Sequence, residues 1–417
     1  MVIVGIIDAG KKVGSLNTWS FSSLLYEIFR KNPPNLKKIE DKGLLAVKLG
    51  QMLALRFDFL PPETCTVLSE LYQNTDRMPP EDFAQLLAGH VDDGWREHFA
   101  AIDEEPMASA SVGQVHRARL RGGAPVVVKL IKKDFAAGFR KDVRTVTRLF
   151  RVLTFVYPRL KKVADPLGLL EMIENDTLAE LDLTNEITNQ ILLRNICERH
   201  RHEVDLDDLG FPKTYPELSN TNVLVTEAIA GTTLETRLER GDLEYQHLKN
   251  LFRLHGFFMF GIGVFHGDLH PGNVILDGDR LYFVDCGAIG RVSDKLRRGL
   301  FQFMKQLSNN DFPNCAAALR TMSDREISDS RYKVFLPKLL NLYKDFPGKT
   351  VSEVSLTEQM MYTIKLGVHH GMSFEKGMFP IIKSLMYIDG MVLRCNPQAI
   401  LMEDMQEFIP QLEEFVG

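Results

Sequence analysis

Residues 266–290 carry the sequence HGDLHPGNVILDGDRLYFVDCGAIG, which predicts a loop followed by a tight β-hairpin. The segment 266–273 is rich in Gly, Pro and Asn and is typical of a loop. Ile275 and Leu276 then form a short strand, 277–279 turns the chain, and 281–285 alternates as a strand that ends on a carboxylate. The hairpin therefore brings two acid-bearing ends of the segment to one place.

The polar residues of this segment suit a magnesium ion and a nucleoside triphosphate. A triphosphate needs a divalent cation between its oxygens, and carboxylate and amide oxygens are the hard ligands that magnesium prefers. Asn273 and Asp285 are the candidate metal ligands. Asp268 is the candidate catalytic group, because a carboxylate there can orient or deprotonate a hydroxyl or a water.

Turn geometry alone also favours Asp, Asn and Gly in such a segment. The order and spacing are more specific, because they match the kinase catalytic-loop pattern HRDxxxxN, with Gly267 in place of the arginine. Asp285-Cys286-Gly287 then stands where a kinase has DFG. The segment therefore favours a nucleotide enzyme of kinase type.

A kinase-like core also needs a lysine on a strand behind a loop that covers the phosphates. Residues 108–131 predict strand, turn and strand, with Lys129 inside the apolar run VVVKLI. A lone lysine there would more often point to solvent from an edge strand, but its place between the loop and the 266–290 segment favours phosphate binding. The loop has alanine where kinases have glycine, which makes it stiffer. Its candidate nucleotide-binding residues are Ala108, Ser109, Ala110, Ser111 and Val112.

The acidic partner of Lys129 is predicted far along the chain. The segment after Lys129 forms a basic amphipathic helix, with apolar residues such as Phe139 and Val143 on one face. After a break near Asp165-Pro166, residues 178–190 (LAELDLTNEITNQ) predict a second helix. Glu186 in that helix is the expected partner of Lys129.

Four motifs in order make the chain resemble the UbiB family of atypical kinase-like ATPases, also called aarF-domain kinase-like proteins. They are KxGQ at 48–51, ASAS at 108–111, ExD at 180–182, and HGDLHPGN at 266–273 with its DxG. The resemblance runs from about Gly43 to about Pro397. Cys286 departs from it, because the family usually has phenylalanine there.

The resemblance implies an α+β, bilobal protein-kinase-like fold that uses ATP and Mg²⁺, with a helical KxGQ extension and helical insertions in the N-lobe. In the family the extension lies across the cleft where protein kinases bind peptide, and ExD engages it. Lys48 and Gln51 share a helix face, and Glu180 and Asp182 offer the opposite charge. We therefore expect Lys48 to pair with Glu180 or Asp182. The alternative is two solvated faces that never meet.

The resemblance and the element pattern divide the chain into four parts. Residues 1–35 have no assigned role, 36–98 form the helical extension with breaks at Pro61-Pro62 and Pro79-Pro80, 99–226 form the N-lobe with its helical insert, and 227–417 form the C-lobe. The hinge between the lobes would meet adenine through the backbone of Glu227 and Ile229.

Composition restricts the partners and the location. A net charge of −5 argues against general nucleic-acid binding. The segment 117–162 is nevertheless strongly basic, so its helix either lies on an anionic membrane surface or presents a solvated basic face. No apolar stretch approaches the roughly 20 residues of a membrane span. Five cysteines without paired spacing suit a reducing compartment. We expect a cytoplasmic protein, peripheral at the inner membrane.

The resemblance implies ATP hydrolysis in support of ubiquinone or related prenyl-quinone lipid biosynthesis, with a lipid or quinone precursor and a biosynthetic complex as partners. Two alternatives stay open. One is a small-molecule kinase, because aminoglycoside and choline kinases share an HGDxHxxN loop, although they lack KxGQ and ExD. The other is a nucleotide-binding scaffold that regulates a biosynthetic complex.

Overall fold

The computed structural model describes residues 18–54, 60–72, 78–109, 112–132, 135–156, 166–375 and 377–416. They form an α+β structure in which the chain builds two compact units. The N-terminal unit comprises residues 1–123, 127–182 and 220–224, and the C-terminal unit comprises the remainder. Strands β4 and β6 are each divided between the two units.

The helices of the N-terminal unit cover the predicted extension and the predicted insert. They are α1 (Thr18–Arg30), α2 (Leu36–Glu40), α3 (Leu44–Ala54), α4 (Pro62–Ser69), η1 (Glu70–Tyr72), α5 (Pro80–His90), η2 (Trp95–His98), α6 (Phe135–Val156) and α8 (Pro166–Glu180). Helices α4 and α5 each begin at the second proline of a Pro-Pro pair, where the missing N–H costs nothing. The predicted breaks at these two pairs are therefore confirmed.

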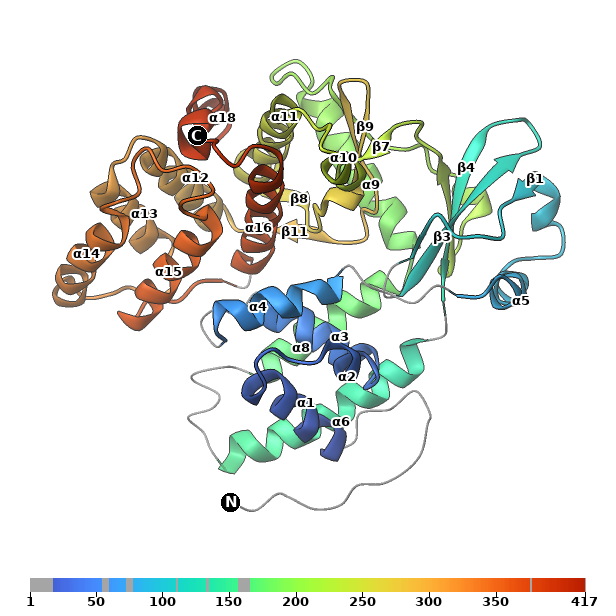
Figure 1. Ribbon diagram of the computed structural model, residues 1–417, viewed down its shortest axis with the longest axis horizontal. Coiled ribbons are helices and arrows are strands. Elements are labelled where there is room, and N and C mark those ends of the chain that lie inside the picture. Colours follow the sequence, from blue (N-terminus) through green and yellow to red (C-terminus); the bar gives the residue numbers. More distant parts are fainter. Residues whose placement is uncertain are drawn as a thin grey trace. The chain divides into compact units, whose positions relative to one another are not determined.

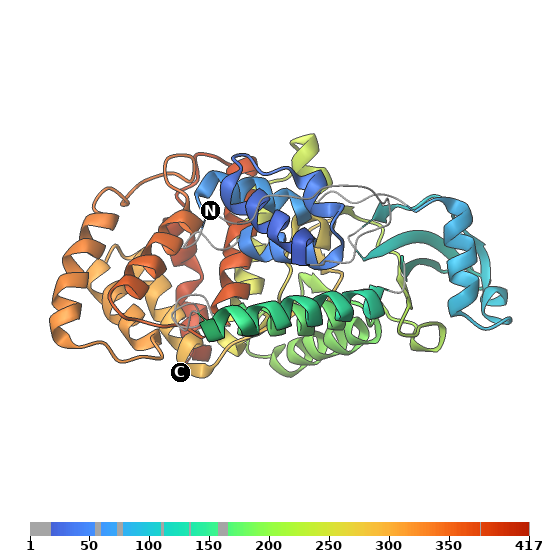
Figure 2. The same cartoon turned by 90° about the horizontal axis from the view of Figure 1, so that it is seen from below.

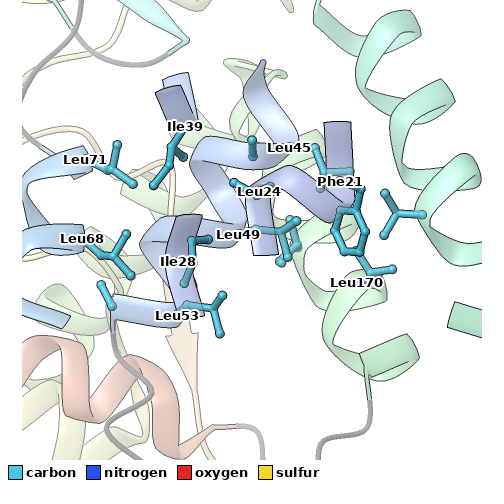
Figure 3. Close-up of a cluster of buried hydrophobic side chains, with 14 of the residues drawn as sticks. Phe21, Leu24, Ile28, Ile39, Leu45, Leu49, Leu53, Leu68, Leu71 and Leu170 are labelled. Atoms are coloured by element: carbon cyan, nitrogen blue, oxygen red, sulfur yellow. The ribbon is translucent and has the colours of Figure 1, made fainter. Parts of the chain in front are cut away.

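One apolar core joins most of these helices. Figure 3 shows side chains from α1, α2, α3, α4, η1 and α8 converging on it, among them Phe21, Leu45, Leu68 and Leu170. Each of these four side chains is buried, and the Phe21 ring packs edge-on against Phe150 of α6 at 5.5 Å between centroids. Helix α1, from the segment with no assigned role, is thus part of the core that carries KxGQ.

Helix α6 has the predicted amphipathic form. Figure 2 shows it as one long helix beside the helices α1 to α3. Phe139, Val143 and Val146 are buried, because the apolar residues recur at helical spacing and face the core. The basic side chains on the other face are exposed; they are Arg140, Lys141, Arg144, Arg148 and Arg151.

The prediction of one helix over residues 178–190 is wrong. Helix α8 ends at Glu180, and α9 (Thr184–His200) begins after a short interruption at 181–183. Asp182 N–H still bonds to Ala179 C=O at 3.3 Å, but Leu183 turns inward and is buried. Glu180 and Glu186 therefore lie on different helices.

The predicted strand, turn and strand around Lys129 are present. The described strands of this sheet run in the order β1 (Phe99–Ile102), β3 (Gly113–Leu120), β4 (Pro125–Ile131) and β6 (Val223–Glu227), with β2 (Ala108–Ser109) on β3. Gly123 in the turn has a φ of 87°, a conformation that favours glycine.

The C-terminal unit contains the predicted hairpin and a largely helical remainder. Strands β9 (Val274–Asp277) and β10 (Arg280–Phe283) pair antiparallel, with Val274 opposite Phe283. The other strands are β5 (Leu209–Gly210) on β10, β7 (Thr232–Thr233) on β9, and the pair β8 (Val264–His266) and β11 (Ile289–Arg291).

Helices of the C-terminal unit surround these strands, and Figure 1 shows α12 to α15 as a group beyond α16. Those not yet given are η3 (Pro216–Leu218), α10 (Leu234–Arg240), α11 (Tyr245–Gly256), η4 (Phe257–Ile262), η5 (Pro271–Asn273), α12 (Asp294–Ser308), α13 (Phe312–Met322), α14 (Asp329–Tyr343), α15 (Leu356–His369), α16 (Met378–Cys395), α17 (Leu401–Asp404), η6 (Met405–Glu407) and α18 (Ile409–Val416). Among the described residues, none of the helices combines the length and the apolar character that a membrane span needs.

The two aromatic residues Phe21 and Trp19 test whether α1 belongs to the core. Phe21→Ala removes a ring that is 1% exposed and should lower the free energy of unfolding by about 3–5 kcal/mol. Trp19→Ala on the same helix is the matched control, because Trp19 is 60% exposed and its loss should change stability by less than ~0.5 kcal/mol. Calorimetric unfolding of both variants measures the difference. Equal melting temperatures would show that α1 does not contribute to the core.

Candidate functional site

The catalytic loop starts where β8 meets β11. His266 lies opposite Ile289 in this antiparallel pair, and Gly267 N–H donates to Ala288 C=O at 2.9 Å. A Cβ on Gly267 would lie 3.0 Å from Gly290 N and 3.2 Å from Ile289 C, both backbone atoms. Close approach of the two strands therefore explains why glycine stands where the kinase pattern has arginine.

His266 holds the loop in place as a neutral imidazole. Its Nε2 lies 2.9 Å from Val284 C=O and must donate to it, so Nδ1 is free to accept the Asp268 N–H at 3.2 Å. The side chain is fully buried, and burial lowers the pKa of His266 in spite of the nearby carboxylates. The ring therefore fixes the backbone of Asp268 without carrying charge.

Asn273 is oriented by the loop itself. Its Nδ2 donates to Asp268 C=O at 3.0 Å, so its Oδ1 is the amide atom left for a metal. Val284 N–H donates to Asn273 C=O at 3.0 Å, which continues the hairpin register by one step. The two predicted metal ligands, Asn273 and Asp285, therefore come from neighbouring backbone positions.

Asp285 has a backbone conformation that is rare outside glycine. Its φ is +53°, in the left-handed region that Asp and Asn tolerate better than other side chains. Such strain is typical of functional sites, where the surrounding structure maintains it. Cys286 beside it is fully buried, as expected for a small apolar filler.

Two carboxylates flank Gly287. A Cβ on this glycine would lie 3.4 Å from Asp285 Oδ1 and 4.0 Å from Glu186 Oε2. Helix α9 is tied to the same turn, because Asn189 Nδ2 donates to Cys286 C=O at 3.0 Å. Asn189 lies one helical turn after Glu186, which was a signal in the sequence, but the prediction did not include it.

Asp268 contacts a lysine that the sequence reasoning missed. Lys383 Nζ of α16 lies 2.9 Å from Asp268 Oδ1, with side-chain exposures of 16% and 33%. Burial by itself would raise the pKa of Asp268, but the ammonium and hydrogen bond of Lys383 outweigh it, and the pKa is lowered. Asp268 is therefore held as a carboxylate.

In the N-terminal unit, the start of β3, which follows the predicted loop, packs against Lys129. A Cβ on Gly113 would lie 3.7 Å from Lys129 Cε and 3.4 Å from Leu130 O, so the strand after the loop packs on the lysine side chain. Ala108 and Ser109 pair with β3, and the Val112 carbonyl accepts from Lys132 N–H at 2.9 Å.

Two other predictions, one for this loop and one for Lys129, are not tested by the described residues. Ala110 and Ser111 lie outside the described residues. Lys129 and Glu186 belong to different units, and their pairing stays a prediction.

The predicted hinge is partly engaged by protein groups. Glu227 N–H donates to Lys213 C=O at 2.8 Å, and Ala228 N–H donates to Pro125 C=O at 3.1 Å. Adenine recognition by this segment therefore has to use other groups, such as the Glu227 carbonyl and the Ile229 N–H.

The expected pairing of KxGQ with ExD is confirmed for one residue pair. Lys48 Nζ forms an ion pair with Glu180 Oε2, and the two side chains are 11% and 33% exposed. Gln51 is buried and donates from Nε2 to Leu71 C=O at 2.9 Å, within the extension itself. Asp182 follows the end of α8, and its contribution to the motif stays a prediction.

The donor set fits magnesium in chemical type. Across the described ranges, no group of three or more His, Cys, Asp or Glu side chains could enclose a metal. A magnesium site built on the Asn273 amide oxygen and the Asp285 carboxylate would be an open one, in which phosphate and water would complete the shell.

The contact at Gly267 is open to a direct test. Gly267→Ala should lower stability by about 1–3 kcal/mol and reduce any turnover, because β8 and β11 must separate to admit the Cβ. Gly390→Ala is the matched control, since a Cβ there, in α16 of the same unit, meets no atom within 4 Å. Calorimetry measures both variants. A Gly267→Ala protein as stable as the control would contradict the close approach.

Comparisons with known proteins agree with this geometry. Residues 70–319 match the family model described as ABC1 atypical kinase-like domain. The chain is 28% identical over 386 residues to "Probable protein kinase UbiB" of Tolumonas auensis, with 89% of this chain and 68% of the relative covered. For the protein of the same description from Vibrio vulnificus, the identity is 27% over 401 residues, covering 89% of this chain and 69% of the relative.

A solved structure shares the fold. It is the complex of Rv3197 with erythromycin from Mycobacterium tuberculosis, with a TM-score of 0.56, 21% identity, and coverage of 87% of this chain and 92% of that one. The predicted α+β kinase-like fold is thus confirmed. The motifs, the family match and the two UbiB relatives lead to one conclusion: this chain belongs to the UbiB family of ABC1 atypical kinase-like proteins.

Proposed function

We propose that this protein binds Mg-ATP and hydrolyses it, in support of ubiquinone or related prenyl-quinone lipid biosynthesis at a membrane. The observation that carries the proposal is the strained backbone of Asp285, together with an Asn273 whose amide nitrogen donates to Asp268 C=O and so leaves the amide oxygen for a metal. A carboxylate and an amide oxygen at neighbouring backbone positions suit a nucleotide-bound magnesium.

Different side chains of the protein would bind the metal, orient the attacking water and bind the nucleotide. Magnesium, when bound through Asn273 and Asp285, neutralises charge on the triphosphate. Asp268 is held ionised and orients the attacking water or hydroxyl. Lys129 binds phosphate from beneath the loop and pairs with Glu186, while Glu227 and Ile229 contact adenine through the backbone.

Hydrolysis is favoured over protein phosphorylation by the KxGQ helices. The ion pair of Lys48 with Glu180 fastens α3 to α8 within the N-terminal unit. In the proposal this fastening keeps the extension across the peptide site. A small-molecule kinase is the second candidate, because the M. tuberculosis structure of the same fold contains erythromycin. That enzyme class lacks the Lys48 and Glu180 motifs, so the pair argues for the ATPase.

Removal of one charge tests the metal role. Asp285→Asn keeps a side chain that tolerates the left-handed backbone, so its effect reports the lost carboxylate. We expect magnesium-dependent phosphate release from ATP to fall by about 10²–10³-fold, and ATP affinity in magnesium to fall as well. Asp277→Asn, an exposed hairpin carboxylate, is the control. Normal magnesium-dependent turnover by Asp285→Asn would sink the metal assignment.

Charge reversal on the exposed basic face of α6 tests whether this face binds a membrane. The Arg144→Glu/Arg148→Glu double variant should lose binding to phosphatidylglycerol-containing vesicles, because anionic lipid attracts this face. The wild type should bind these vesicles more weakly as salt rises, and should not bind pure phosphatidylcholine. Vesicle sedimentation measures both, with Arg298→Glu, an exposed arginine of α12, as control. Equal sedimentation of all three proteins would exclude this face as the docking surface.

A further inference from the structure

The catalytic loop has no permanent cation of its own. Between Asp268 and Asn273 the sequence is DLHPGN, without lysine or arginine, and Gly267 replaces the arginine of the kinase pattern. The rings of His266 and His270 each accept a backbone N–H at Nδ1, from Asp268 and Gly272, so neither ring is a doubly protonated cation. Phosphoryl transfer spreads charge over the oxygens of the transferred group and is stabilised by cations placed beside it.

Helix α16 brings a lysine to this loop from a distant part of the chain. The start of α16 approaches β11, since a Cβ on its N-cap Gly377 would lie 2.9 Å from Arg291 C=O. Lys383 Nζ lies 2.9 Å from Asp268 Oδ1 and 5.7 Å from the ring centroid of Tyr387, one turn later on the same helix. Tyr387 in turn meets His270 edge-on at 5.3 Å between centroids. Both the ammonium and the ring are therefore held against the catalytic loop.

We propose that Lys383 is the cation of the catalytic loop: from α16 it holds the Asp268 carboxylate and binds the oxygens of the transferred phosphoryl group. The ion pair at 2.9 Å keeps the ammonium of Lys383 beside the Asp268 carboxylate. The backbone of Asp268 is fixed on both sides, by His266 and by Asn273. An ammonium beside that carboxylate is therefore near the atom that Asp268 orients, which is where the phosphoryl group is attacked.

The inference rests on the proposed hydrolysis of ATP. In that reaction the γ-phosphorus loses its bond to the bridging oxygen, which leaves with ADP, and gains a bond to the oxygen of water. Water and ATP thus give ADP, inorganic phosphate and one proton, which passes to solvent. Lys383 stays protonated throughout and contributes charge and hydrogen bonds, not a proton.

The test compares Lys383→Met and Lys383→Arg with the wild type. We expect Lys383→Met to lower kcat by about 10²–10³-fold with little change in KM for ATP, because the contact strengthens in the transition state. Lys383→Arg keeps the charge and should recover most of the loss. Lys305→Met is the matched control, since Lys305 pairs with Glu413 in the same unit. A Lys383→Met variant that melts earlier but keeps its kcat would overturn the proposal.

A double variant separates contact with phosphate from an effect on Asp268 alone. In the Asp268→Asn background, Lys383→Met should cause a further loss of turnover, because the phosphoryl contact is removed as well. No further loss would mean that Lys383 acts only through Asp268, and would refute the phosphoryl contact.

A binding measurement keeps the inference distinct from the proposed function. ADP with aluminium fluoride mimics the transferred group and can be followed by calorimetry without turnover. The wild type should bind ADP more tightly when aluminium fluoride is added, and Lys383→Met should lose that gain while its affinity for ADP alone is unchanged. If the wild type releases no phosphate from ATP, the proposed function fails, but this comparison still decides the role of Lys383. Equal gains in both proteins would refute that role.

Discussion

The close approach of the β8 and β11 backbones is the constraint on which the catalytic half of the structure depends. Gly267 and Gly290 leave no room for a Cβ, since one on Gly267 would meet backbone and one on Gly290 would meet the Phe265 ring at 2.3 Å. The two strands pair antiparallel by hydrogen bonds. The chain between them, residues 267–288, must therefore return to β8 where it began. The catalytic loop and the Asp285 turn are consequently parts of one hydrogen-bonded element.

Neutral polar groups do most of the positioning inside this element. The imidazole of His266 bonds to Val284 C=O and to Asp268 N–H, so it joins the end of the hairpin to the catalytic loop. The amide of Asn273 donates to Asp268 C=O within that loop. Because these groups carry no charge, they fix the geometry without cancelling the field of the carboxylates. In the proposed function the carboxylates of Asp268 and Asp285 act on ions and phosphate, and Lys383 of α16 forms an ion pair with Asp268.

Local sequence rules predicted the local structure well. The hairpin at 274–283, the strands around Lys129 and the amphipathic α6 follow from alternation, turn residues and helical spacing. The interruption at 181–183 was not predicted, because Leu183 suits a helix and its burial becomes apparent only in the fold. Lys383 carries no local signal, since it is a single lysine in an apolar helix. Its role becomes visible only through its contact with Asp268, a residue distant in the sequence, which a periodic pattern cannot predict.

The path of the chain has a consequence for how the protein is made. The chain passes between the two units after residues 123, 126, 182, 219 and 224, so neither unit is one continuous piece. The ribosome releases a chain from its N-terminus, and contiguous domains can fold as they emerge. Here the N-terminal unit waits for Asn220–Leu224, which arrive only after α9 of the other unit has been synthesised. The apolar core shown in Figure 3 can form early, but the sheet that holds Lys129 is completed only when β6 has been synthesised, about 100 residues after Lys129.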